Sequence, residues 1–194
     1  MKKRHFLGMA AAGAAWTHVA HAAAAERTAG PGPALLTVSG AVRKTNRGPL
    51  DPVLDQMMAK QKLTFDKARA FDFATLAAMP AVTIAPTLEY DRKVHRLRGP
   101  RLTDVLAAAG VSGDAAKLAM RAVDGYAPTL PLADARKYRF IVATHLDGKP
   151  MPLGGLGPLW AVYDADRFAD MAAKPVDQRF ALCPWALYHI DVQV

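Results

Sequence analysis

Apolar and polar positions follow a helical period in one stretch of the chain, 99–111. Between Leu102 and Ala109 the apolar side chains recur at i, i+3, i+4 and i+7, which places four of them on one helical face. Gly99 and Pro100 precede this stretch, and Gly110 follows its last apolar residue. Proline suits the first turn of a helix, and glycine suits the left-handed residue that ends one. The pattern therefore predicts a short amphipathic helix.

Most other apolar segments have the pattern of strands. The alternation of apolar and polar residues over 118–123 and 188–194 predicts strands with one buried face, and it places His189 on the polar face of the last strand. The continuous apolar run 140–143 predicts a strand that is buried on both faces. Further strands are expected at 35–40, 63–65, 81–87 and 159–163.

Turn residues connect these strands and separate them from short helices. Asp124-Gly125 and Asp147-Gly148 both have the sequence typical of a type I′ hairpin, which needs positive φ at two positions. The strand 126–132 contains prolines, so we expect it at a sheet edge. Asp72 is the expected N-cap of a brief helix through Leu76, and other short helices are expected at 53–59 and 133–136. The fold class predicted is α+β, with a mixed, β-rich sheet structure and a few short helices.

The first residues resemble an export signal. Three basic residues, Lys2 to Arg4, precede an alanine-rich apolar run, and Ala20-His21-Ala22 matches a small-x-small cleavage site. The apolar run is too short to cross a bilayer, so we expect a cleavable signal over 1–22 and no stable membrane anchor after cleavage. We expect a flexible lead-in over 23–33, a single domain over 34–194, and a mature protein in the periplasm or outside the cell. Lys3-Arg4 leaves the twin-arginine and the general export routes open.

Composition argues against disorder and against nucleic-acid binding. The chain has 194 residues, 52% of them hydrophobic and 22% charged, which suits one domain with a proper core. The net charge is +8, but 22 basic residues against 17 acidic ones remain once Lys2, Lys3 and Arg4 are removed. These basic residues are scattered, so the charge suits a small anionic ligand rather than nucleic acid.

Residues that could carry chemistry show no recognised catalytic spacing. The single cysteine, Cys183, is expected as a small buried side chain, because one thiol makes no internal disulfide. The histidines after the signal, His95, His145 and His189, have no close metal-ligand spacing, and no metal site is predicted. Neither serine lies in a nucleophile-elbow motif.

Several short motifs, taken in order, resemble the molybdopterin-binding domain of the sulfite oxidase family. The matching segments are Gly99–Leu106, Asp124-Gly125-Tyr126, Pro131–Ala135, Asp147–Met151, Gly157-Pro158-Leu159, Trp185 and Ile190-Asp191-Val192. The resemblance covers about Ala34 to Val194 and implies a mixed α+β fold. It also implies a molybdenum–pterin cofactor and an oxidoreductase that transfers an oxygen atom or two electrons.

The sequence departs from this family where the metal is held. Family members ligate molybdenum with a cysteine in a Cys-x-Glu pattern just before the glycine-proline segment, and the spacing here places Thr87-Leu88-Glu89 at that point. A hydroxyl is a far poorer ligand than a thiolate for this metal. Trp160 likewise stands where many members have arginine. Two functions therefore remain: a molybdopterin-type oxidoreductase, or a non-redox periplasmic module that binds a ligand or a protein partner.

A pterin or another small anion would need basic and aromatic contacts. The candidate binding residues are His95, Arg96, Arg98 and Arg101, with Arg43 and Lys149 as secondary candidates. Tyr126 and Trp160 are candidates for the walls of an organic ligand site.

Overall fold

The computed structural model describes residues 32–111 and 115–194, which belong to one compact unit, Pro31–Val194. The predicted signal over 1–22 and most of the predicted lead-in lie outside these residues. No helix of the described part is long and apolar enough to span a membrane.

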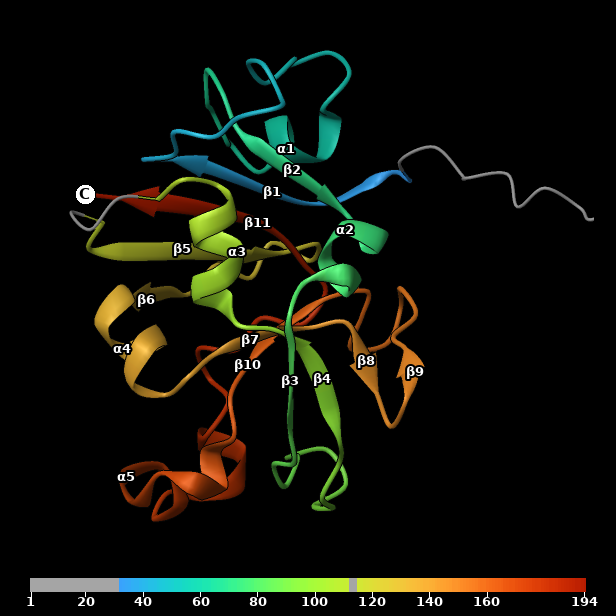
Figure 1. The fold of residues 1–194 in the computed structure, drawn as a ribbon, viewed down its shortest axis with the longest axis vertical. Helices are drawn as coiled ribbons and strands as arrows, with labels where there is room; N and C mark the ends of the chain where they lie inside the picture. Colours follow the sequence, from blue (N-terminus) through green and yellow to red (C-terminus); the bar gives the residue numbers. More distant parts are fainter. Residues whose placement is uncertain (1–31, 112–114) are drawn as a thin grey trace, which may run out of the picture. The chain divides into compact units, whose positions relative to one another are not determined.

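The strands, which Figure 1 labels individually, form three sheets. A five-stranded sheet has the order β2 (Arg69–Asp72), β1 (Ala34–Gly40), β11 (Leu187–Gln193), β5 (Lys117–Ala122) and β6 (Thr129–Pro131). A four-stranded sheet has the order β3 (Ala81–Ile84), β4 (Leu97–Pro100), β8 (His145–Leu146) and β9 (Lys149–Pro150). The third sheet pairs β10 (Trp160–Val162) with β7 (Ile141–Ala143). Among the named strands of residues 32–111 and 115–194, β1 and β11 pair in parallel and the other pairs are antiparallel, so the predicted mixed α+β fold is confirmed.

The helices are short. They are α1 (Gln56–Lys60), α2 (Phe73–Ala78), α3 (Leu102–Ala108), α4 (Leu132–Lys137) and α5 (Ala169–Ala172), with the 3-10 helices η1 (Ala165–Arg167) and η2 (Val176–Gln178). Asp72 caps α2 as predicted, because its Oδ1 accepts a hydrogen bond of 2.7 Å from the Thr75 N–H. Gly110 follows α3 with φ +73°, which confirms its predicted left-handed role.

The predicted start of α3 is wrong. Gly99 and Pro100 belong to strand β4 rather than to the first helical turn, and the helix begins at Leu102. Glycine is needed at position 99 because β4 crosses β7 closely: a Cβ there would lie 1.9 Å from the Val142 carbonyl oxygen. The helical face itself was predicted correctly, since Leu102, Val105 and Leu106 are all buried.

Other differences come from tertiary packing. Residues 63–65 form no strand; Phe65 lies in a loop and stacks on His189, with 6.1 Å between ring centroids. His189 does lie on a polar face, opposite Thr37 and Arg121, but the prediction that only one face of this strand is buried is wrong: His189 is 1% exposed in the interior strand β11. Only Gly125 of the first Asp-Gly pair has positive φ, whereas both Asp147 and Gly148 do.

Several strand predictions are confirmed. All three residues of β7 are fully buried, as expected for a strand covered on both faces. In β5, Leu118, Met120 and Ala122 face the core. β6 is an edge strand, as its prolines indicated.

Candidate functional site

The segment after β3 contains Thr87, the residue that the sequence spacing assigns to the expected metal-ligand position. Its N–H donates a hydrogen bond of 2.7 Å to Asp166 Oδ2, and Thr87 forms an isolated antiparallel bridge with Val94. The Asp166 Oδ1 atom accepts a 2.7 Å bond from Arg179, which fixes the carboxylate. Thr87 and Glu89 are both partly buried. The backbone of this segment is therefore anchored, and the side chain that the sequence spacing aligns with the family's thiolate is a hydroxyl.

Cys183 is the only thiol of the chain, and it belongs to the core. The residue is 4% exposed, and burial raises the pKa of its thiol well above the ordinary value. The Tyr163 N–H lowers this pKa in part, and the negative charge of Glu89 raises it further. The sulfur of Cys183 therefore stays protonated at neutral pH.

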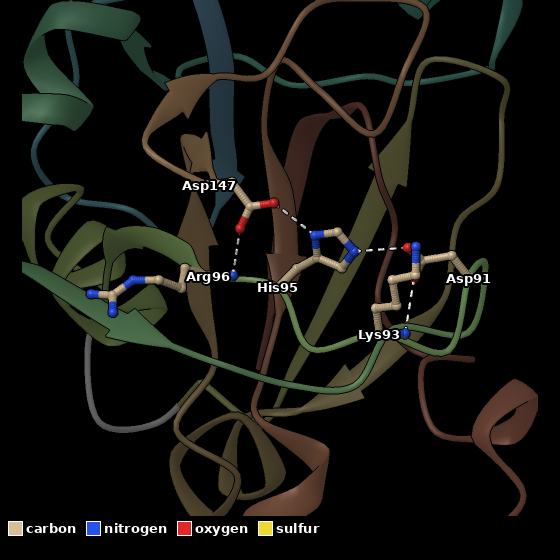
Figure 2. A network of polar contacts seen from close by, with 5 residues as sticks. All are labelled: Asp91, Lys93, His95, Arg96 and Asp147. Carbon is tan, nitrogen blue, oxygen red and sulfur yellow. Dashed lines mark hydrogen bonds and ion pairs between the residues drawn. The ribbon is translucent and has the colours of Figure 1, made fainter.

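His95 lies between two carboxylates, as Figure 2 shows. Its Nδ1 is 2.7 Å from Asp147 Oδ2, and its Nε2 is 3.0 Å from Asp91 Oδ2. These hydrogen bonds, first to Asp147 and then to Asp91, raise the pKa of the imidazole. Asp147 also accepts from the Arg96 N–H, at 2.9 Å. Both ring nitrogens are therefore occupied, and His95 joins the segment between β3 and β4 to the β8–β9 turn.

The other predicted basic residues do not gather around His95. Arg96 contributes its backbone N–H to the network, while its guanidinium extends away from the imidazole (Figure 2). Arg98 is exposed in β4 opposite Thr83 and His145. Arg43 is exposed beside the end of α3, and Lys149 is exposed in β9. Arg101 lies just after β4 and lines a cleft that none of these residues reaches.

That cleft contains three arginines, and we call it the arginine cleft. Its volume is about 410 Å³, and it is lined by Val82, Ile84, Arg101, Tyr138, Arg139, Asp164, Arg167 and Phe168. The chain places Arg101 beside the end of α4, because the Leu102 N–H donates a 2.9 Å bond to the Phe140 carbonyl and Arg101 bridges Ile141. Asp164 and Arg167 come from the turn that follows β10.

Asp164 is the buried polar residue of the arginine cleft. It is 8% exposed, and its Oδ2 accepts a hydrogen bond of 3.3 Å from the Ala85 N–H. Its Oδ1 is buried and has no hydrogen-bond partner in the described part of the chain. A second cleft of about 520 Å³ shares Arg101 and Arg139 and adds Arg136. Sequence reasoning found only Arg101 of this set, because no recognised motif marks Arg136, Arg139 or Arg167.

The two aromatic candidates lie apart from the arginine cleft. Trp160 is 1% exposed, and its indole N–H donates a 2.9 Å bond to the Cys183 carbonyl. Tyr126 is half-exposed, and its hydroxyl donates to the Ala181 carbonyl. Neither residue lines the arginine cleft. Trp160 is a core residue that holds the Cys183 segment against β10.

The described histidines are His95, His145 and His189. Within 32–111 and 115–194, no group of three or more His, Cys, Asp or Glu side chains is placed to hold a metal ion. His189 contacts Ser39 Oγ at 2.9 Å, and burial lowers the pKa of this histidine to about 4. His145 contacts Thr144 Oγ1 at 2.8 Å.

Comparisons with known proteins identify the family. The family described as oxidoreductase molybdopterin binding domain matches residues 57–163. A solved structure, the sulfane dehydrogenase SoxCD from Paracoccus pantotrophus, matches the fold with a TM-score of 0.53 at 13% sequence identity. The match covers 81% of this chain and 37% of the SoxCD chain, so this protein spans little more than a third of that relative. No curated protein matches the sequence. The chain belongs to the oxidoreductase molybdopterin-binding domain family, the sulfite oxidase-type domain that its sequence motifs resemble.

Proposed function

We propose that this protein is an exported, non-redox ligand-binding domain that keeps the molybdopterin-binding fold without a protein thiolate for molybdenum. One observation carries the proposal. The sequence spacing assigns the family's ligand position to Thr87, and the only thiol, Cys183, is buried in the core with a raised pKa. Molybdenum in this family is held by a deprotonated sulfur, which neither residue supplies. The protein donors of this chain therefore do not fit the metal centre of the family.

An oxidoreductase that binds molybdopterin is the second candidate. It is favoured by the family match over residues 57–163 and by the fold shared with a sulfane dehydrogenase. In that case the chain would carry out two-electron or oxygen-atom transfer, with the metal held without a cysteine. A fold alone hosts many functions, so the residues at the site decide between the candidates.

Export to the periplasm or beyond is part of the proposal. It is supported by Lys2-Lys3-Arg4, the apolar run that follows and the Ala20-His21-Ala22 motif. The mass of the intact protein purified from its native source tests this directly. A chain that begins at residue 23 is expected, and a mature chain that retains residues 1–22 would contradict export by cleavage.

Metal and pterin analysis tests the main proposal. The wild-type protein is produced in a host that makes molybdopterin, and molybdenum is measured by mass spectrometry together with pterin fluorescence after denaturation. We expect neither in stoichiometric amount. Stoichiometric molybdenum with pterin would refute the non-redox proposal and support the second candidate.

The Thr87→Cys variant tests whether the missing thiolate is the only difference between this chain and a family member that binds molybdenum. If the rest of the family site is intact, this change alone will confer molybdenum retention. Thr83→Cys is the matched control, because Thr83 is an exposed threonine of the preceding strand β3. Retention by both variants would indicate nonspecific binding by an added thiol.

A further inference from the structure

The arginine cleft has the features of a ligand site. We propose that it binds a small molecule with a phosphate or carboxylate at one end and an amine at the other, joined by an apolar or aromatic body. This inference rests on the proposed non-redox, ligand-binding function, and it names the site and the chemical class of the ligand.

Three arginines without partners indicate the acidic end of the ligand. Arg101, Arg139 and Arg167 are exposed, and none of them has an ion pair or a side-chain hydrogen bond among the residues the structure describes. In contrast, Arg47 pairs with Asp55 at 2.6 Å and Arg179 pairs with Asp166 at 2.7 Å. Guanidinium groups present N–H donors in a planar fork that matches carboxylate and phosphate oxygens. Three unpaired forks around one cleft therefore favour an anion.

The backbone holds two of these arginines, Arg101 and Arg139, next to each other. The 2.9 Å bond from the Leu102 N–H to the Phe140 carbonyl and the Arg101–Ile141 bridge hold Arg101 next to Arg139. Arg139 itself has φ +54°, which is an uncommon conformation for a residue with a side chain. Two arginines that are anchored side by side can bind the same acidic group.

Asp164 indicates the amine end of the ligand, because one of its carboxylate oxygens has no hydrogen-bond partner among the described residues. Its Oδ1 is buried without a partner, although buried carboxylate oxygens are normally hydrogen-bonded. The other oxygen is held by the Ala85 N–H, so the carboxyl group is oriented within the wall of the cleft. A ligand N–H or ammonium group would satisfy the free oxygen with a charge-assisted hydrogen bond. No arginine of the cleft is close enough to Asp164 to form an ion pair.

The body of the ligand follows from the remaining walls. Val82 and Ile84 of β3 and the rings of Tyr138 and Phe168 line the space between the charged groups. The Tyr138 hydroxyl donates a 2.7 Å bond to Asp170, so this residue offers its ring rather than its hydroxyl. A volume of about 410 Å³ lies in the range of small-molecule sites.

Calorimetric titration with four matched probes tests the proposal. Tyramine phosphate and 4-(2-aminoethyl)benzoate carry an acid, a ring and an amine; 4-ethylphenyl phosphate lacks the amine, and tyramine lacks the acid. We expect one or both of the first two to bind, and to bind about tenfold or more tightly than either incomplete probe. The comparison of the first two identifies phosphate or carboxylate as the preferred acid. Equal binding of tyramine, or no binding of either complete probe, would overturn the proposal.

Variants assign the binding to this cleft. Arg139→Gln should weaken the better complete probe by about tenfold or more. Arg92→Gln is the matched control, since Arg92 is also exposed and has a similar φ of +57° but lies outside the cleft. Asp164→Asn should remove the advantage of tyramine phosphate over 4-ethylphenyl phosphate. Equal effects of both arginine variants, or an unchanged advantage in Asp164→Asn, would refute the assignment.

The two proposals fail in different ways. Molybdenum and pterin content are measured on the same samples that are titrated. A stoichiometric molybdenum–pterin cofactor refutes the non-redox function, whether or not the probes bind. A cofactor-free protein that does not bind the complete probes refutes only the assignment of the arginine cleft.

Discussion

Gly99→Ala tests the close crossing of β4 over β7, which places Arg101 beside Arg139. A Cβ at position 99 would lie 1.9 Å from the Val142 carbonyl oxygen and 2.8 Å from the Ala143 Cα. Both neighbours are backbone atoms of β7, whose residues are fully buried, so no flexible side chain can move to make room. The added methyl group must instead separate two strands.

We expect this substitution to lower the free energy of unfolding by about 3 kcal/mol or more, the upper part of the range for overpacking a rigid core. For a chain of this length, that corresponds to a fall in Tm of about 6–12 °C. Thermal unfolding followed by circular dichroism measures it. Gly48→Ala is the control, because a Cβ there meets no atom within 4 Å, and its Tm should change by no more than about 2 °C. An unchanged Tm in Gly99→Ala would refute the close approach of the two strands.

Three further predictions concern the candidate residues. Hydrogen bonds to Asp147 and Asp91 raise the pKa of His95 in the folded protein. Protonated His95 therefore stabilises the fold fully below the pKa of the unfolded chain, about 6.5, and this stabilisation is lost as the pH rises through the pKa of the folded protein. Urea unfolding of wild type and His95→Gln should therefore differ more near pH 6 than near pH 9, roughly the two sides of that titration; a constant difference would contradict the ion pairs. Trp160→Phe should cost about 1–3 kcal/mol in urea unfolding, because it leaves the buried Cys183 carbonyl without its donor; no loss would show that the hydrogen bond is absent. Iodoacetamide should alkylate Cys183 only in denaturant, because the thiol is buried and its pKa is raised; rapid labelling of the native protein at neutral pH would contradict this.

Features that depend on neighbouring residues could be predicted from the sequence. The Asp72 cap, the left-handed Gly110 and the buried face of α3 each depend on residues within one or two turns of the chain. The continuous apolar run of β7 likewise indicated burial on both faces without knowledge of its neighbours.

The sequence could not predict features that depend on distant segments. His189 has the alternation of a polar-face residue, yet a loop 124 positions earlier places Phe65 over it. Gly99 and Pro100 have the local sequence of a helix start. The close approach of Gly99 to Val142, which explains the glycine, cannot be deduced from neighbouring residues.

The candidate site was predictable only in part. Counting back from Gly99 assigned the family's ligand position to Thr87, and charge alone made Arg101 a candidate anion contact; both assignments stay predictions. The arginine cleft is built by a hydrogen bond between Leu102 and Phe140 and by the turn after β10, which bring together arginines that are 28 or more positions apart. No spacing rule connects such residues before the strands are placed.

Native mass spectrometry of the protein from its own source most directly tests the claim that the fold is kept without a thiolate-bound molybdenum centre. The measurement gives the mass of the folded chain together with anything bound to it. We predict no stoichiometric species with the mass of a molybdenum–pterin group, since Thr87 and the protonated Cys183 supply no thiolate. A stoichiometric molybdenum–pterin adduct on the wild-type chain would contradict the claim.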